Sequence, residues 1–310
     1  MKRLIALVSV IIILVLAGYF LLTRKTSNPM VLGSSINNFY LEKTVKVEKH
    51  PSKIADIKDP NILADAAFLI DKKTKYPLFE KNSLKQVPIA SITKVMTATV
   101  ALDLYKLSDV VEVKKEDIEV EGSKVFLKAG EKITVENLLY CLLMNSGNDA
   151  ALTLSDAKIT RAEFIVLMNK KAEFLGLEST AFFDPAGLND QGHSSARDVA
   201  LLFANALSNK DFEKIVSTAE KDVTSVDGVE VHKLKNSDRL TTGEIPLDGV
   251  IGGKTGFTYD AGHTLVTAAS KNNSTIIGVV LKTFSDTPSA SAAEMKKLLD
   301  WGFTSYTFTP

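Results

Sequence analysis

Segments with strand-like patterning lie near both ends of the ordered part of this chain, and helical patterning fills its middle. The apolar run Ala66–Ile70 and the segment Tyr76–Glu80 predict a first hairpin, and His263–Ser270 with Thr275–Leu281 predict a second. Two hairpins so far apart stabilise one another only if they share a sheet. We therefore expect an α/β (α+β) fold, with an antiparallel sheet from both chain ends flanked by helices and a helical subdomain inserted between them.

Local signals mark where individual elements begin and end. Thr134 is a predicted N-cap, and the box that starts at Ser195 opens another helix. Gly176 ends a helix that begins near Arg161. Pro77 restricts its strand to an edge or a bulge, because proline cannot donate to the hydrogen-bond ladder.

The N-terminus has the clearest compositional bias. Leu4 to Leu22 is an uncharged apolar run of 19 residues, about 28 Å long as a helix and sufficient to cross a bilayer. We expect residues 1–25 to be an uncleaved membrane anchor, with a cleaved signal peptide as the alternative. Residues 26–60 are polar and irregular and predict a linker, and residues 61–310 predict the catalytic domain.

Charge and cysteine content exclude some classes of protein. The 310 residues include 37 basic and 37 acidic side chains, so nothing favours nucleic acid as a partner. The one cysteine, Cys141, cannot form an intramolecular disulfide, and its apolar neighbours predict a core position.

Ser91 and Lys94 stand three residues apart at the start of an apolar run. On a helix this spacing places a hydroxyl beside an amine, about 5–6 Å apart at Cβ. A lysine with a lowered pKa can take a serine proton and make the serine nucleophilic. The alternative is a capping serine with a solvated lysine, and Ser155 and Lys158 show that the spacing recurs by chance.

Two further motifs follow. Gly147 interrupts a helix between Ser146 and Asn148, which predicts either a turn with two polar side chains or a simple helix stop. The segment Lys254–Gly256 opens a strand, where a lysine and a threonine can hold an anion and glycine lets another backbone approach closely. Both side chains can serve one site only if this is an edge strand lining a cleft.

Taken together, these three motifs resemble the SxxK, SxN and KTG motifs of penicillin-binding proteins and serine β-lactamases. Agreement around the motifs is similar to the low-molecular-weight D-alanyl-D-alanine carboxypeptidases and covers about Ala66 to Phe303. The segments that carry this wider resemblance are Pro88–Thr97, Asn145–Ala150, Gly253–Thr258 and Lys297–Phe303.

The resemblance implies three catalytic residues. Ser91 would attack the carbonyl of the penultimate D-alanine and become acylated, and Lys94 would act as the base. Ser146 would relay a proton to the departing D-alanine. Water would then release the acyl-enzyme.

The resemblance also implies a set of substrate-binding residues. Asn148 would position the peptide backbone, and Lys254 and Thr255 would hold the terminal carboxylate. Gly256 would allow close approach of the substrate. The backbone N–H groups of Phe257 and of the nucleophile would form the oxyanion hole.

The implied partners are a peptidoglycan stem peptide ending in D-Ala-D-Ala and β-lactam antibiotics as covalent inhibitors. No cofactor or metal is expected, because the four histidines are scattered without ligand spacing. We expect a single-pass protein of the bacterial cell membrane with its catalytic domain outside the cytoplasm, or a secreted one if the anchor is cleaved. The oligomeric state stays open.

Three alternatives use the same residues. A DD-endopeptidase would cut crosslinks, and a catalytically silent protein would only bind the cell wall. A β-lactamase-like activity is disfavoured, because Pro185 stands where the class A enzymes have the glutamate of their Glu-x-x-Leu-Asn loop.

Overall fold

The structure is a computed structural model that describes residues 49–284, 287 and 289–308. The expected anchor, residues 1–25, and most of the expected linker lie outside the described residues. Among the helices of the described part, none has both the length and the apolar character to cross a membrane.

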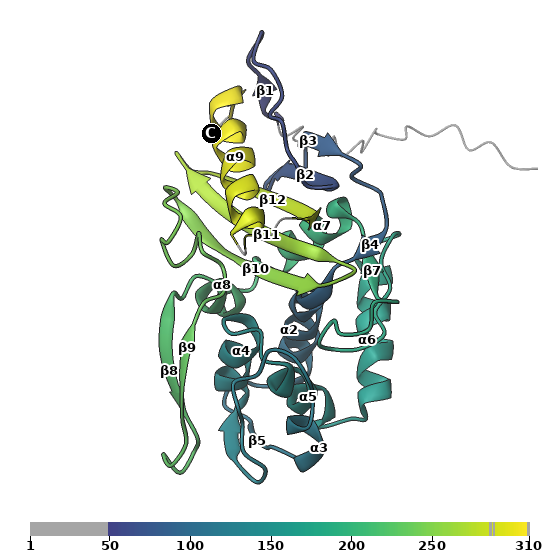
Figure 1. Cartoon of the computed structure of the whole chain (residues 1–310), viewed down its shortest axis with the longest axis vertical. Coiled ribbons are helices and arrows are strands. Elements are labelled where there is room, and N and C mark those ends of the chain that lie inside the picture. The colour runs from purple at the N-terminus through teal and green to yellow at the C-terminus, as the bar shows by residue number, and fades with distance from the viewer. Residues whose placement is uncertain (1–48, 285–286, 288, 309–310) are drawn as a thin grey trace, which may run out of the picture. The chain divides into compact units, whose positions relative to one another are not determined.

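A five-stranded antiparallel sheet forms the centre of the fold, with strand order β10-β11-β12-β2-β3 (Figure 1). The bounds are β2 Ala66–Asp71, β3 Pro77–Lys81, β10 Val250–Thr258, β11 Gly262–Lys271 and β12 Ser274–Thr283. Phe68 of β2 pairs with Val279 of β12, so the two predicted hairpins join in one sheet. The expected sheet from both chain ends is confirmed.

The turn between β11 and β12 shows why this hairpin was predictable. Asn272 and Asn273 both have positive φ, 50° and 62°, which is the geometry of the tight turn that follows the natural strand twist. Asparagine tolerates this left-handed backbone better than most residues. At the other side of the sheet β3, which contains Pro77, is an edge strand as expected.

Helices cover both faces of the sheet (Figure 1). Helix α9 (Ala290–Ser305) contacts β11 and β12, and α7 (Ala196–Ala206) contacts β12 and β2. Neighbouring residues of β2 therefore enter different cores: Phe68 packs with the central helices, whereas Leu69 packs with Leu299 of α9. This explains why every residue of β2 is buried.

The expected helical subdomain lies between β3 and β10 in sequence. Its helices are η1 Ala90–Ile92 (a 3-10 turn), α2 Thr93–Leu104, α3 Lys115–Ile118, α4 Val135–Leu143, α5 Asn148–Asp156, α6 Arg161–Phe174 and α8 Lys210–Val216, with α7 at the sheet. Short strand pairs complete it: β4 Val87–Pro88 with β7 His193–Ser194, β5 Val110–Glu112 with β6 Lys132–Thr134, and β8 Glu220–Thr224 with β9 Val231–Lys235.

The predicted helix ends are confirmed by their hydrogen bonds. Thr134 accepts from Asn137 N at the start of α4, and Ser195 accepts from Asp198 N at the start of α7. Gly176 follows α6 with a φ of 68°, a conformation that glycine adopts without steric cost. Cys141 is fully buried in α4, as expected.

A short strand lies within the segment expected to be a linker, and it pairs with a strand near the C-terminus. Strand β1 (Ser52–Lys53) pairs with β13 (Tyr306–Thr307), and Trp301 Nε1 donates to Lys58 O at 2.9 Å. Residues near 52 thus pack onto the end of the catalytic domain.

Candidate active site

Ser91 lies in the 3-10 turn η1, immediately before α2, so its backbone belongs to the first turn of a continuous helical segment. The preceding residue, Ala90, has a φ of 50°, which is costly for a residue with a side chain. Such strain persists only where the surrounding structure holds it, and it is common at functional sites.

Lys94 is fully buried one turn further on, and its Nζ is surrounded by three oxygens. Nζ lies 2.8 Å from Ser91 Oγ, 2.7 Å from Asn148 Oδ1 and 2.7 Å from Ala186 O. The last two oxygens can only accept hydrogen bonds, whereas the serine hydroxyl can also donate. As a donor Nζ can bond to all three oxygens, and in the neutral form it can keep the two bonds to Asn148 and Ala186 and turn its lone pair to the Ser91 hydroxyl.

The surroundings of Lys94 favour this neutral form. Burial, and then the positive charge of Lys254, hold the pKa of Lys94 well below its usual value of 10.5. The predicted contact of hydroxyl and amine is thus present, in surroundings that favour the neutral amine.

Lys254 is also fully buried, on β10. Burial lowers the pKa of Lys254 to about 7, opposed by the attraction of Asp238. Thr255 lies at the cavity surface, and its hydroxyl is 2.6 Å from Ser237 Oγ. Strand β10 is an edge strand of the sheet, as required for both residues to serve one cleft.

Gly256 allows β10 to lie against η1. A Cβ on Gly256 would be 3.0 Å from Ser91 N and 2.9 Å from Ile89 O, so a side chain would push the strand away from the nucleophile. Phe257 follows with its ring half exposed at the cavity. Glycine thus lets the backbone of β10 lie close to that of η1, while the expected approach of a substrate stays a prediction.

Ser146 and Asn148 lie at the turn between α4 and α5. Ser146 has a φ of 60°, and its buried Oγ has no hydrogen-bond partner within the part of the chain that the structure describes. Asn148 accepts from Lys94 through Oδ1 and donates to Glu121 O through Nδ2, at 2.6 Å. The Asn148 side chain is thus held at both ends, whereas the Ser146 hydroxyl has its hydrogen bonds available for a bound molecule.

The loop from Asp184 to Asn189 contributes a contact that the sequence did not reveal. In this loop the Ala186 carbonyl accepts a hydrogen bond from Lys94. The Asp184 carboxylate accepts hydrogen bonds from four backbone amides of the same loop. The sequence signalled only a turn here. A backbone carbonyl carries no residue-type signature, so the lysine contact was missed.

These groups surround a cavity of about 600 Å³. Of the predicted site residues, Ser91, Ser146, Asn148, Thr255, Gly256 and Phe257 line it, and Lys94 and Lys254 are buried next to lining residues. Further lining residues not predicted from the sequence are Gly122, Ser123, Asn145, Gly187, Leu188, Ser237, Arg239, His263 and Ser291. Across the described ranges, no cluster of three metal-ligating side chains occurs.

The fold is that of the penicillin-binding DD-transpeptidases. The crystal structure of the Streptomyces K15 DD-transpeptidase matches with a TM-score of 0.74 and 31% identity, over 80% of this chain and 100% of that one. A penicillin-binding protein homologue from Mycobacterium tuberculosis matches with a TM-score of 0.74 and 32% identity, over 83% of this chain and 96% of that one.

Within this class, the chain belongs to the D-alanyl-D-alanine carboxypeptidase family, peptidase S11, whose family model matches residues 53–285. The D-alanyl-D-alanine carboxypeptidase DacF of Bacillus subtilis is 35% identical over 80% of this chain. A D-alanyl-D-alanine endopeptidase of Pseudomonas aeruginosa is 32% identical over 78% of this chain and 78% of its own length. The alignments span 64% of DacF and 65% of the Escherichia coli carboxypeptidase DacC.

Proposed function

We propose that the protein is a serine-type D-alanyl-D-alanine carboxypeptidase that removes the terminal D-alanine of peptidoglycan stem peptides through an acyl-enzyme on Ser91. The observation that carries this proposal is the environment of Lys94 Nζ, which lies between Ser91 Oγ and two obligate acceptors. Membership of the carboxypeptidase family supports the substrate class.

In the first step, Lys94 Nζ takes the hydroxyl proton of Ser91 while Oγ bonds to the carbonyl carbon of the penultimate D-alanine. The negative charge on the carbonyl oxygen is stabilised by the backbone N–H groups of Ser91 and Phe257, a contribution of several kcal/mol in comparable sites. The C–N bond then breaks. The departing amine takes the proton that Lys94 received, relayed through the Ser146 hydroxyl, which has no competing partner among the described residues, and Lys94 is neutral again.

The terminal carboxylate is held by Lys254 and Thr255. A charged lysine and a hydroxyl on one edge strand match the carboxylate of a free chain end. Asn148 has its side-chain amide fixed between Lys94 and Glu121, so it presents a constant edge to the peptide. In the second step water attacks the ester, and the proton it releases returns to Ser91 Oγ through Lys94.

We also propose where the protein acts in the cell and how its chain divides into an anchor, a linker and a catalytic domain. Residues 4–22 would anchor the protein in the bacterial cell membrane, residues 26–60 would connect the anchor, and residues 61–310 would form the catalytic domain outside the cytoplasm. Sodium carbonate extraction of membranes tests the anchor: the full chain should stay in the pellet, and release would refute retention of the apolar segment.

Penicillin labelling tests the reaction class. Intact-mass spectrometry should show one penicillin adduct on the native protein, located on Ser91 and absent from Ser91→Ala. Release of D-alanine from a pentapeptide then identifies the carboxypeptidase. Cleavage of a crosslinked muropeptide without D-alanine release would indicate an endopeptidase instead, which is the named activity of the Pseudomonas aeruginosa relative.

A further inference from the structure

A loop of residues 121–128, here termed the wall loop, lines one side of the cavity through Gly122 and Ser123. It is bonded directly to Asn148. The Asn148 side chain donates to Glu121 O at 2.6 Å, and its backbone N donates to Ser123 O at 2.7 Å. Since Asn148 Oδ1 also accepts from Lys94, one amide couples the wall loop to the lysine.

The other end of the wall loop is held by buried ionisable side chains. The Asp149 carboxylate accepts from the amides of Val125 and Leu127, at 3.2 Å each. The carbonyl of Val125 bonds to His232 Nδ1 at 3.1 Å, so both polar backbone groups of this residue are engaged. Asp149 adjoins Asn148 in α5, whereas His232 comes from β9, far along the chain.

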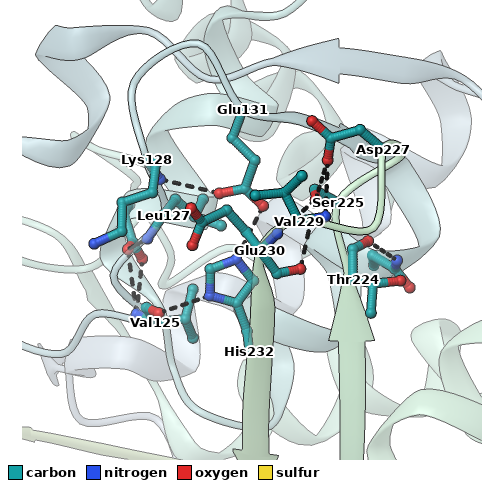
Figure 2. Close-up of polar contacts among 12 residues, drawn as sticks. Val125, Leu127, Lys128, Glu131, Thr224, Ser225, Asp227, Val229, Glu230 and His232 are labelled. Atoms are coloured by element: carbon teal, nitrogen blue, oxygen red, sulfur yellow. Dashed lines mark hydrogen bonds and ion pairs between the residues drawn. The ribbon is translucent and has the colours of Figure 1, made fainter.

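His232 bridges the wall loop and Glu131 (Figure 2). Its Nε2 lies 2.9 Å from Glu131 Oε1, and its Nδ1 faces the Val125 carbonyl. Glu131 Oε2 in turn accepts from Lys128 N at 3.0 Å. A carbonyl and a carboxylate both accept, so the ring satisfies both only as an imidazolium, with two N–H donors.

The electrostatic surroundings also favour the charged ring. The hydrogen bond to Glu131 raises the pKa of His232 above its usual 6.5, and Asp149 acts in the same direction. Val223 of strand β8 pairs with His232, so the neighbour across the strand pair adds no charge near the ring. Lys221, also on β8, lies over the ring of Tyr140, with Nζ 4.7 Å from its centroid.

We propose that His232 is a positioning residue for the site, acting as a protonated latch that holds the wall loop against Asn148 and thereby holds Lys94. This inference rests on the proposed function for its catalytic consequence. Loss of the proton leaves the ring one N–H, so either the Val125 carbonyl or Glu131 faces a lone pair. The latch is therefore closed at pH below the His232 pKa and opens as pH rises through it.

The segment that follows His232 also contacts residues at the cavity. Lys235 N donates to Asn145 Oδ1 at 2.8 Å, and Ser237 N donates to Met144 O at 2.9 Å. Ser237 then contacts Thr255 at the cavity. The strand that carries His232 is thus bonded to the turn that holds Ser146 and Asn148.

The latch is tested by titration on the native, full-length protein. NMR of the ring should give His232 a pKa above 6.5, and hydrogen exchange at the Val125 and Leu127 amides should accelerate on the order of tenfold, beyond its base-catalysed trend, as pH passes that value. The proposal would be overturned by a His232 pKa at or below 6.5. It would also be overturned if amide exchange at Val125 and Leu127 did not change as pH passes that pKa.

Variants connect the latch to the chemistry. Glu131→Gln keeps an acceptor for Nε2 but removes the charge, so it should lower the His232 pKa by about one unit. The part of the alkaline decline of penicillin acylation that follows His232 should move to lower pH by the same amount. His232→Gln should lose that part, whereas the decline from deprotonation of Lys254 near pH 7 should remain in every variant. His50→Gln, an exposed histidine remote in sequence, is the matched control and should change nothing.

The outcomes separate the two proposals. If penicillin acylation depends on pH in the same way in Glu131→Gln and in the native protein, the latch is refuted, even though both proteins are active. Absence of acylation at every pH, native protein included, would refute the proposed function, while the ring titration and amide exchange would still decide the latch.

Discussion

Gly187 lies directly against the carbonyl of Ala90: a Cβ on Gly187 would fall 2.0 Å from Ala90 O. Both residues have positive φ, 78° and 50°. The loop that supplies the Ala186 carbonyl to Lys94 is therefore in contact with the strained residue that precedes Ser91. Two backbone segments, each in an unusual conformation, fix Ser91 and Lys94 relative to one another.

Gly187→Ala should destabilise the fold and reduce acylation. The substitution adds left-handed strain and a backbone clash, together roughly 2–5 kcal/mol. Gly176→Ala is the matched control: its φ is 68° and nothing lies within 4 Å of the added Cβ, so it should cost only about 1–2 kcal/mol. Urea unfolding measures both. Equal losses would show that the contact with Ala90 is unimportant.

Lys94→Met should slow penicillin acylation by on the order of 10²–10⁴-fold, because the base is removed while a side chain of similar length remains. Stopped-flow fluorescence with a labelled penicillin measures the rate, and circular dichroism checks the fold. Lys158→Met is the control, since Lys158 follows Ser155 at the same spacing but pairs with Asp109 at the surface. A comparable rate loss in the control would contradict the assignment.

The free energy of unfolding should rise with pH above neutrality. Folded Lys254 releases its proton near pH 7, whereas the unfolded side chain keeps it to about 10.5. Between these values unfolding takes up a proton, so increasing pH favours the folded state. Thermal melts from pH 6 to 9 measure the slope, and Lys254→Met should reduce it, leaving the contribution of Lys94, whose pKa is also lowered by burial. An unchanged slope in that variant would assign the pH dependence to other groups.

Ser146→Ala should separate stability from activity. The Ser146 hydroxyl is buried and bonds to nothing among the described residues, so its removal should leave the melting temperature unchanged or slightly raised. Turnover of a D-Ala-D-Ala peptide should nevertheless fall on the order of 10²-fold or more, because proton transfer to the leaving amine is lost. A clear drop in melting temperature would indicate a structural role instead.

Local patterns predicted most of this fold. Ser91 and Lys94 meet because three residues make nearly one helical turn, and the Asn272–Asn273 turn fixes the register of its hairpin. Their partners are close in sequence, so the pattern alone determines the contact. The same holds for the capping side chain of Thr134.

Contacts between distant segments were not predictable in this way. The Ala186 carbonyl meets Lys94 across 92 positions of sequence, and Glu131 meets His232 across 101. No periodicity relates such pairs, and one partner in the first is a backbone atom. Only the assembled tertiary structure brings them together.

The pairing of β2 with β12 has a consequence for biosynthesis. Phe68 emerges from the ribosome long before Val279, its neighbour in the finished sheet, so the central sheet cannot close until nearly the whole chain exists. Such long-range closure slows folding. The cavity wall formed by β10 can therefore meet Ser91 only after most of the chain has been synthesised.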